Sequence, residues 1–282
     1  MDALLNPAGG AEAATPAALA QSALWRNNVR FAGAGDRTIV FAHGFGCDQA
    51  VWRWVAPAFE TDHLTVCFDH VGAGGSDPAS YCPEKYASLD GYVQDLLEIC
   101  EQAQLRDIVY VGHSVSAMIG VLAAIRAPAL FDRLVLIGPS PRFLNDEGYV
   151  GGFERADMDE LLGALEDNFV TWSASMAPVI MNNPSRPELG QALANTFCRL
   201  HPTVAKQFAR VTFLSDCRAA LPSVRTPSLI LQCSDDTIAP IEVGRYLHRQ
   251  ISGSALRVMA ATGHCPHMSA PEETIAAIRA FL

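Results

Sequence analysis

The chain has 282 residues, 50% of them hydrophobic, and a formal net charge of -10 at pH 7. This length allows one large buried core, either as a single α/β domain or as a domain with an insertion. The acidic balance makes nucleic acid and anionic membranes poor partners, and no apolar run approaches the ~18 residues of a membrane span.

The first 26 residues are predicted to form a flexible extension. They are rich in Ala, Pro and Gly and contain no strand pattern. A short helix over 16–25 is the alternative, with Thr15 as its cap. A basic start followed by an apolar run is lacking, so we expect no secretory signal. The eight cysteines form no C-x-x-C pair, which favours reduced thiols in a cytoplasmic protein.

Seven short β-branched runs predict strands. They are VRFAG (29–33), TIVFAHG (38–44), LTVCFDHV (64–71), DIVYVGHS (107–114), RLVLIGPS (133–140), SLILQCSD (228–235) and LRVMAATGH (256–264). Apolar residues at helical spacing over 89–100, 115–125, 240–250 and 271–282 predict helices that alternate with several of these strands. This alternation, with continuously apolar strands, predicts an α/β fold with a mostly parallel sheet flanked by helices.

Residues 141–222 interrupt the alternation, because they show helical patterns and no strand pattern. An all-helical insertion in an α/β chain usually covers the carboxyl ends of the strands, where ligands bind. We therefore expect a core built from residues 27–140 and 223–282, and a helical lid over residues 141–222.

The sequence GHSVSA (112–117) resembles the nucleophile-elbow motif G-x-S-x-G. Ser114 ends a predicted apolar strand and begins a predicted apolar helix, which is the context that the motif requires. The closing position is Ser116 instead of glycine. The turn demands small flanking residues, and serine adds little bulk. Alone the match is weak, because such short patterns occur often by chance.

The last two predicted strands end in CSDDTIAP and ATGHCPHM. A serine hydroxyl needs a histidine to remove its proton, and that histidine needs a carboxylate to orient it. These ends predict Asp236 as the acid, with Asp235 as the alternative. His264 is the predicted base, preferred over His267 because it stands nearer the strand end. The chain order of nucleophile, acid and histidine is that of α/β-hydrolases.

The sequence HGFG (43–46) follows an earlier strand and predicts half of an oxyanion hole. The backbone N–H groups of Phe45 and Val115 are the predicted donors. The two glycines on either side of Phe45 are expected to let this backbone approach a substrate without a Cβ in the way.

Several of these segments together resemble one known family. HGFGCDQAVW, GHSVSAMIG, GPSPRFLNDEGYVGGFE, FLSDCR, LQCSDDTIAP and GHCPHMS are similar to the bacterial stress-signalling hydrolase RsbQ, which the chain resembles most, and to its plant relatives, the strigolactone and karrikin receptors. The resemblance covers nearly everything after about residue 27. It implies an α/β-hydrolase fold with a four-helix lid inserted after the sixth strand, and a Ser114–Asp236–His264 triad.

Four residues of the predicted lid are candidates for a substrate pocket. The resemblance places Trp172 where the family has a lid tryptophan facing an apolar pocket, and Met176 where the plant receptors tend to carry phenylalanine. Phe153 and Phe213 belong to a set of lid aromatics, of which an inward-facing subset would form an apolar pocket above Ser114.

The leading interpretation is a serine hydrolase that cleaves a small apolar ester, lactone or related acyl compound, with no metal and no organic cofactor. A carbon–carbon bond hydrolase uses the same triad and stays open, whereas a dehalogenase needs a carboxylate at position 114. The resemblance implies an alternative: a signalling hydrolase that processes a small hydrophobic ligand and activates a PAS-domain phosphatase partner in stress sigma-factor regulation.

Overall fold

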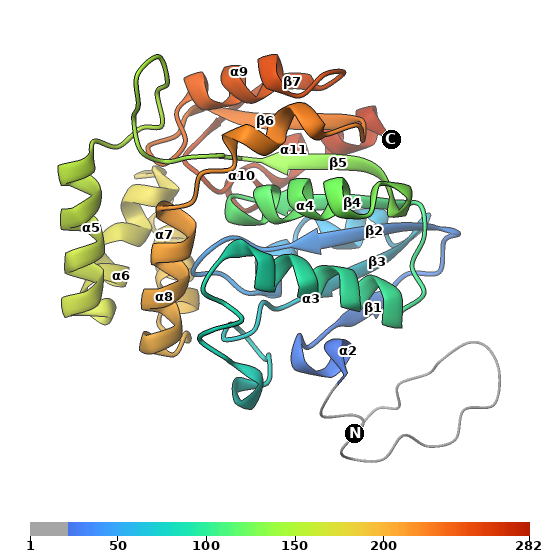
Figure 1. Cartoon of the computed structure of the whole chain (residues 1–282), viewed down its shortest axis with the longest axis horizontal. Helices are drawn as coiled ribbons and strands as arrows, with labels where there is room; N and C mark the ends of the chain where they lie inside the picture. Colours follow the sequence, from blue (N-terminus) through green and yellow to red (C-terminus); the bar gives the residue numbers. More distant parts are fainter. Residues whose placement is uncertain (1–21) are drawn as a thin grey trace.

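The computed structural model describes residues 22–282, which form a seven-stranded sheet in the order β1-β3-β2-β4-β5-β6-β7 (Figure 1). Neighbouring strands are parallel except β1, which runs antiparallel to β3. The strands are β1 (Arg30–Ala32), β2 (Arg37–Ala42), β3 (His63–Phe68), β4 (Ile108–His113), β5 (Phe131–Ile137), β6 (Ser228–Asp235) and β7 (Ala255–Thr262). The predicted α/β fold with a mostly parallel sheet is confirmed.

The burial of each strand follows its place in the sheet. Every residue of the central β4 is buried, and β2 is buried from its second residue onward, because helices cover both faces there. The edge strands differ, since all three residues of β1 and much of β7 are exposed. The continuous apolar runs in the sequence therefore mark the centre of the sheet.

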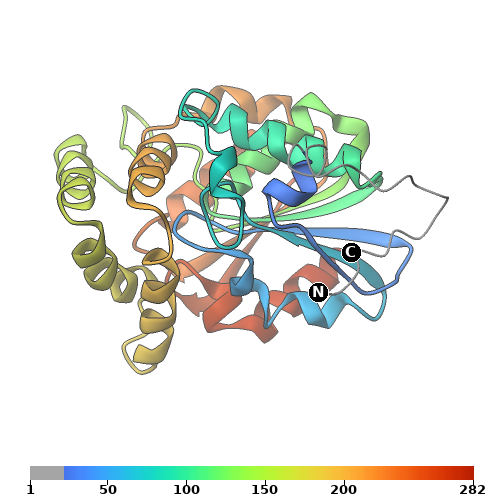
Figure 2. The ribbon, with the colours of Figure 1, turned by 90° about the horizontal axis from the view of Figure 1, so that it is seen from below.

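Helices pack on both faces of the sheet (Figure 2). On one face α3 packs against α4, and a 3-10 turn at Arg218–Ser223 contacts both α4 and α9. On the opposite face α11 lies beside the turns that follow β2, where Arg279 Nη1 donates to Asp62 Oδ2 at 3.0 Å. These helices are α3 (Leu89–Gln102), α4 (Val115–Arg126), α9 (Ile241–Gln250), the short α10 (Pro266–Ser269) and α11 (Pro271–Phe281).

A layer of four helices, called the helical insertion below, lies beyond the carboxyl ends of the strands (Figure 1). It consists of α5 (Arg155–Asp167), α6 (Phe169–Met181), α7 (Pro187–Phe197) and α8 (Pro202–Phe213). The insertion follows β5, the fifth strand of residues 22–282, and not the sixth strand as the resemblance implied. The apolar runs in the sequence predict five strands before residue 141, and β1 to β5 agree with those runs and not with the number that the resemblance implied.

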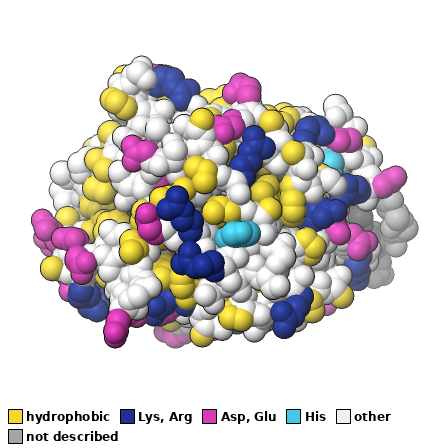
Figure 3. Space-filling model, turned by 90° about the horizontal axis from the view of Figure 1, so that it is seen from above, with side chains coloured by type: hydrophobic (Ala, Val, Ile, Leu, Met, Phe, Trp, Pro, Cys, Tyr) yellow, Lys and Arg dark blue, Asp and Glu magenta, His cyan; other side chains and the backbone are white. Residues whose placement is uncertain are grey.

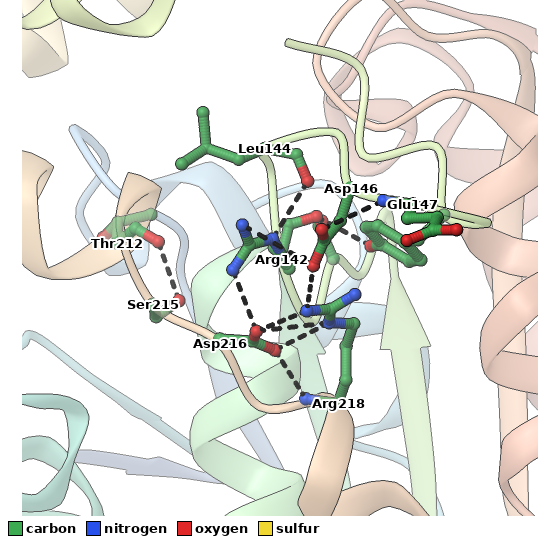
Figure 4. Close-up of polar contacts among 10 residues, drawn as sticks. Arg142, Leu144, Asp146, Glu147, Thr212, Ser215, Asp216 and Arg218 are labelled. Carbon is green, nitrogen blue, oxygen red and sulfur yellow. Dashed lines mark hydrogen bonds and ion pairs between the residues drawn. The ribbon is translucent and has the colours of Figure 1, made fainter. Parts of the chain in front are cut away.

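Ion pairs join the two segments that connect the helical insertion to the core (Figure 4). Arg142, on the segment leaving β5, donates from Nη1 to Asp216 Oδ2 at 2.9 Å, on the segment leaving α8. Arg218 Nη2 donates to both Asp216 Oδ2 and Asp146 Oδ2 at 2.8 Å. The Cys217 N–H also donates to the Pro141 carbonyl at 2.7 Å. The entry and exit of the insertion are therefore held together at its base.

A short helix precedes residue 27 in the described chain. Helix α2 (Ala23–Arg26) packs on α3, with Ala23 fully buried. Arg26 pairs with Asp95 at 2.7 Å and with Glu98. The predicted extension over 1–26 is thus wrong for residues 22–26, because the buried Asp95 carboxylate needs a cationic partner. The rest of that prediction, including the helix cap at Thr15, lies outside the described residues.

The lengths of the helices, the surface charges and the cysteines can be compared with the expectations from the sequence. Among residues 22–282 no helix combines the length and the apolar character that crossing a bilayer requires. Acidic and basic side chains are interspersed on the face drawn in Figure 3. All eight cysteines are free thiols.

Candidate active site

Ser114 occupies a sharp turn between β4 and α4. Its backbone has φ 56° and ψ -121°, in a region that side-chain-bearing residues rarely adopt. The Ser114 N–H donates to the Ile137 carbonyl at 2.8 Å, and the Ser114 carbonyl accepts from the Ala117 N–H at 2.9 Å. Such strain persists only where surrounding bonds impose it, and it is typical of functional positions. The turn aims the hydroxyl away from the strand, as a nucleophile elbow does.

The three predicted triad residues come together within hydrogen-bonding distance. His264 Nε2 lies 2.8 Å from Ser114 Oγ, and His264 Nδ1 lies 2.8 Å from Asp236 Oδ2. The other carboxylate oxygen, Asp236 Oδ1, accepts from the N–H groups of Ile238 at 2.9 Å and Ala239 at 3.1 Å. With both its oxygens engaged, the carboxylate holds the Nδ1–H tautomer and leaves Nε2 free to accept the serine proton.

The loop that carries His264 is also bonded to the helical insertion. The His264 main-chain N–H donates to the Ile180 carbonyl of α6 at 2.9 Å. Two residues earlier, at the end of β7, Thr262 Oγ1 donates to the Asn182 carbonyl at 3.1 Å. The position of the imidazole therefore depends on the carboxyl end of α6 as well as on the sheet.

The two alternative residues lie elsewhere. The exposed Asp235 carboxylate accepts from the Asn182 side chain at 3.0 Å, at the end of α6. His267 is fully buried, with its ring centroid 4.6 Å from that of Trp52 and 4.4 Å from that of His113. Neither residue bonds to Ser114 or His264 through its side chain, so the geometry favours the residues first chosen.

The predicted oxyanion donors flank Ser114. Val115 begins α4, so its N–H has no acceptor within the helix. Within residues 22–282 neither the Phe45 nor the Val115 N–H donates to another protein group. Two free amides beside a serine nucleophile are what an oxyanion hole requires.

The glycines beside Phe45 leave room for neighbouring protein groups. A Cβ at Gly44 would lie 2.6 Å from His113 Nδ1, and a Cβ at Gly46 would lie 1.4 Å from the ring of Phe197 on α7. The position at Gly46 therefore faces the helical insertion, whereas a Cβ at Gly44 would also lie 3.1 Å from Ser114 Cβ, directly beside the nucleophile. Gly46 also has φ 78°, which a residue with a side chain rarely adopts. These glycines allow the loop to pack closely on α7 and on the elbow.

An aromatic cluster surrounds the Phe45 ring and includes two of the predicted pocket residues. The cluster draws its members from α6, α7 and α8, and all of them are buried. Their ring centroids lie 6.3 Å (Trp172), 5.9 Å (Phe197), 5.7 Å (Phe208) and 5.9 Å (Phe213) from that of Phe45. The helical insertion thus places apolar rings against the loop that carries one oxyanion donor.

The other two predicted pocket residues lie apart from this cluster. Met176 lines a groove of about 360 Å³ between α5 and α6, which also includes Leu161 and one side of Trp172. Phe153 pairs with Leu144 in a short bridge, and its N–H donates to the Phe143 carbonyl at 3.1 Å. The loop over 143–153 folds back on itself, and this local pairing removes Phe153 from the cluster.

Sequence reasoning missed two histidines at the site. His43 and His70 are buried, their ring centroids are 4.6 Å apart, and both contact Ser116. His43 directly follows the carboxyl end of β2, and His70 stands two residues after the end of β3. The signal used for Asp236 and His264 would therefore have identified them.

Comparison with known proteins agrees with this geometry. A model of the alpha/beta hydrolase family matches residues 39–277. Karrikin insensitive 2 receptor CA of Petunia hybrida is 40% identical over 250 residues, which cover 88% of this chain and 93% of the relative. Strigolactone esterase D14 of Arabidopsis thaliana is 39% identical over 256 residues, covering 90% and 96%.

A solved structure extends the likeness to three dimensions. A hydrolase from Oleispira antarctica superposes with a TM-score of 0.90 at 39% identity, covering 92% of this chain and 95% of that one. The residues matched by the family model include the elbow at Ser114 and the whole helical insertion, and they exceed half of the chain. The chain therefore belongs to the alpha/beta hydrolase family.

Proposed function

We propose that this protein is a serine hydrolase that cleaves a small, mostly apolar ester or lactone through an acyl-enzyme. One observation carries the proposal: the continuous line from Ser114 Oγ through His264 to Asp236, with 2.8 Å at each junction. This arrangement is the one that makes a serine hydroxyl nucleophilic at neutral pH.

The reaction follows from the positions of these groups. Ser114 Oγ attacks the acyl carbon while His264 Nε2 takes its proton, and Asp236 stabilises the resulting imidazolium. The N–H groups of Phe45 and Val115 bind the oxyanion. His264 then protonates the leaving alkoxide. A water molecule, deprotonated by His264, hydrolyses the acyl-enzyme and restores the free serine.

The apolar surroundings support a small apolar substrate. The rings of Trp172 and Phe213 pack on Phe45, the residue that supplies one oxyanion donor. We assign α5 to α8 the role of a lid, since Ser114 is only 6% exposed and a substrate needs these helices to move before it can enter. The free cysteines fit a reducing compartment, so we place the protein in the cytoplasm.

The second candidate is a signalling hydrolase. A relative named as a karrikin insensitive 2 receptor, at 40% identity, favours it. So does the bond between the His264 loop and α6, because it links the reacting residue to the outer helices. In this second candidate, hydrolysis of the ligand changes the conformation of the lid. The resemblance to RsbQ suggests a PAS-domain phosphatase as the partner.

Hydrolysis of p-nitrophenyl acetate and butyrate tests the enzyme proposal. Ser114→Ala should abolish hydrolysis of both esters and leave the melting temperature close to that of the parent. Ser234→Ala, which removes an exposed hydroxyl at the end of β6, is the matched control and should retain full rates. Full activity in Ser114→Ala would refute the assignment.

The receptor candidate needs a separate measurement. Hydrogen exchange of α5 to α8 should be followed before and after turnover of the acyl substrate. A persistent change in protection after the ester is consumed favours signalling, whereas a return to the starting pattern favours simple hydrolysis.

A further inference from the structure

We propose that the Ser116 hydroxyl is a positioning group that fixes the distance between the two halves of the oxyanion hole. The inference rests on the proposed function, because an oxyanion forms only if Ser114 attacks an acyl carbon. Position 116 is the one at which the elbow motif usually has glycine, so this chain carries a hydroxyl where most such turns have none.

The Ser116 hydroxyl bonds to two groups from two other strand ends. Ser116 Oγ donates to the His43 carbonyl at 2.5 Å, and it lies 2.7 Å from His70 Nε2. Ser116 and His43 are fully buried and His70 is 1% exposed. The Ser116 carbonyl in turn accepts from the Tyr110 hydroxyl at 2.9 Å, which holds this residue against β4.

A carbonyl oxygen can only accept a hydrogen bond, and this determines where the protons lie in the cluster. His43 Nδ1 lies 2.8 Å from the Gly44 carbonyl, so Nδ1 carries the proton and donates. His43 Nε2 is then free to accept from the His70 main-chain N–H at 3.1 Å. The Ser116 hydroxyl gives its one proton to the His43 carbonyl, so it accepts from His70 Nε2–H. Four bonds are satisfied with neutral imidazoles.

Burial maintains this neutral arrangement. Desolvation lowers the pKa of His70 well below its ordinary value, and the neighbouring His43 lowers it further. Desolvation also lowers the pKa of His43, although Asp69 and the Gly44 carbonyl oppose the shift. The network therefore keeps the same donors and acceptors throughout the pH range in which a serine hydrolase works.

The network connects the two oxyanion donors by a short path. The Phe45 N–H follows His43 by two residues, and the Val115 N–H immediately precedes Ser116. The Ser116–His43 bond thus ties the loop after β2 directly to the first turn of α4. Because an oxyanion must meet both N–H groups at once, the gap between these two segments determines how well it is bound.

Removing the hydroxyl should loosen this gap without unfolding the protein. His70 Nε2 is also 3.2 Å from the His43 carbonyl, so these two groups can bond directly once Ser116 Oγ is gone. No further polar group of this cluster then loses its partner, but the tie to α4 is lost. Misplacement of one donor by a fraction of an ångström costs about 10- to 100-fold in rate.

The test compares Ser116→Ala and Ser116→Gly with the parent, using p-nitrophenyl acetate. We expect kcat to fall about 10- to 100-fold with KM within about twofold of the parent. A trifluoromethyl ketone, whose adduct with Ser114 carries a true oxyanion, should lose affinity by the same factor as kcat/KM. A role in stability alone would not produce this match.

Ser228→Ala is the matched control. Ser228 is fully buried and its hydroxyl donates to the Thr226 carbonyl at 2.8 Å, but it lies at the amino end of β6, far from the elbow. Its rates and ketone affinity should equal those of the parent. The proposal is overturned if both Ser116 variants keep kcat and ketone affinity within about twofold, or if kcat falls with ketone affinity unchanged.

Two further outcomes keep the two proposals apart. If Ser116→Ala does not fold, Ser116→Gly and Ser116→Cys, which retains a weak donor, supply the same comparison. If the parent and Ser228→Ala show no hydrolysis that depends on Ser114, the proposed function has failed. Normal parent activity together with unaffected Ser116 variants refutes only the positioning role.

Discussion

Replacing His267 with phenylalanine should make the fold more resistant to mild acid. The His267 ring is fully buried between Trp52 and His113. Neither of its nitrogens has a hydrogen-bond partner within residues 22–282. Burial lowers its pKa to about 3, with smaller contributions from its neighbours His264, His43 and Arg53. Phenylalanine keeps an aromatic ring in this position and removes the group that titrates.

The size of the effect follows from the two pKa values. The ordinary histidine pKa of 6.5 applies to the unfolded chain, and the folded value is about 3. Between these values the unfolded state binds more protons, so the free energy of unfolding falls as the pH falls. At about pH 5 the difference spans roughly 1.5 pH units at about 1.36 kcal/mol each, which amounts to about 2 kcal/mol. Above about pH 7 the contribution vanishes.

Urea unfolding at about pH 7.5 and about pH 5.0 measures the effect. For each protein the free energy of unfolding is compared between the two pH values, so that any fixed packing cost of the phenylalanine cancels. The decrease should be about 2 kcal/mol smaller in His267→Phe than in the parent. His201→Gln, which removes an exposed imidazole at the start of α8, is the control and should keep the parental decrease.

An equal decrease in the parent and in His267→Phe would refute the reasoning. It would mean that the buried imidazole at position 267 is protonated in the folded protein as easily as in the unfolded chain. If the free energy of unfolding of His201→Gln also decreased less than that of the parent, loss of any histidine would produce the effect. This result would equally contradict the reasoning.

Three further predictions concern the acid, the loop and the core. Asp236→Asn should lower kcat on the order of 10⁴-fold, because the amide would favour the wrong tautomer of the His264 imidazole. Asp235→Asn should keep a kcat near that of the parent, and steady-state kinetics on p-nitrophenyl acetate measures both. Gly46→Ala should lower the free energy of unfolding by about 1–3 kcal/mol, because its Cβ would overlap the ring of Phe197. Asp95→Ala should cost about 3–5 kcal/mol in urea unfolding, since this 1% exposed side chain neutralises two cations.

The sequence predicted the sheet and the triad because both depend on local patterns. Apolar runs mark central strands, and the carboxyl ends of parallel strands meet at one edge. Ser114, Asp236 and His264 each stand at or just after such an end, so their proximity follows from the fold class alone. Asp236 could be distinguished from Asp235 because it stands at the start of the loop that leads into α9.

The parts that were missed depend on contacts between distant segments. No local pattern shows that Phe197 fills the space beside Gly46, or that Arg26 reaches the buried Asp95. Ser116 was judged by its volume, whereas its hydroxyl matters through bonds to His43 and His70. Side-chain partners of this kind are set by tertiary packing, which a single sequence does not display.

The bond from the His264 N–H to the Ile180 carbonyl restricts how the helical insertion opens. If α6 swung outward as a whole, it would pull the imidazole away from the nucleophile at the moment of substrate entry. In the proposed hydrolase, an opening that keeps this bond intact leaves the carboxyl end of α6 in place, so that the far ends of the four helices move the most.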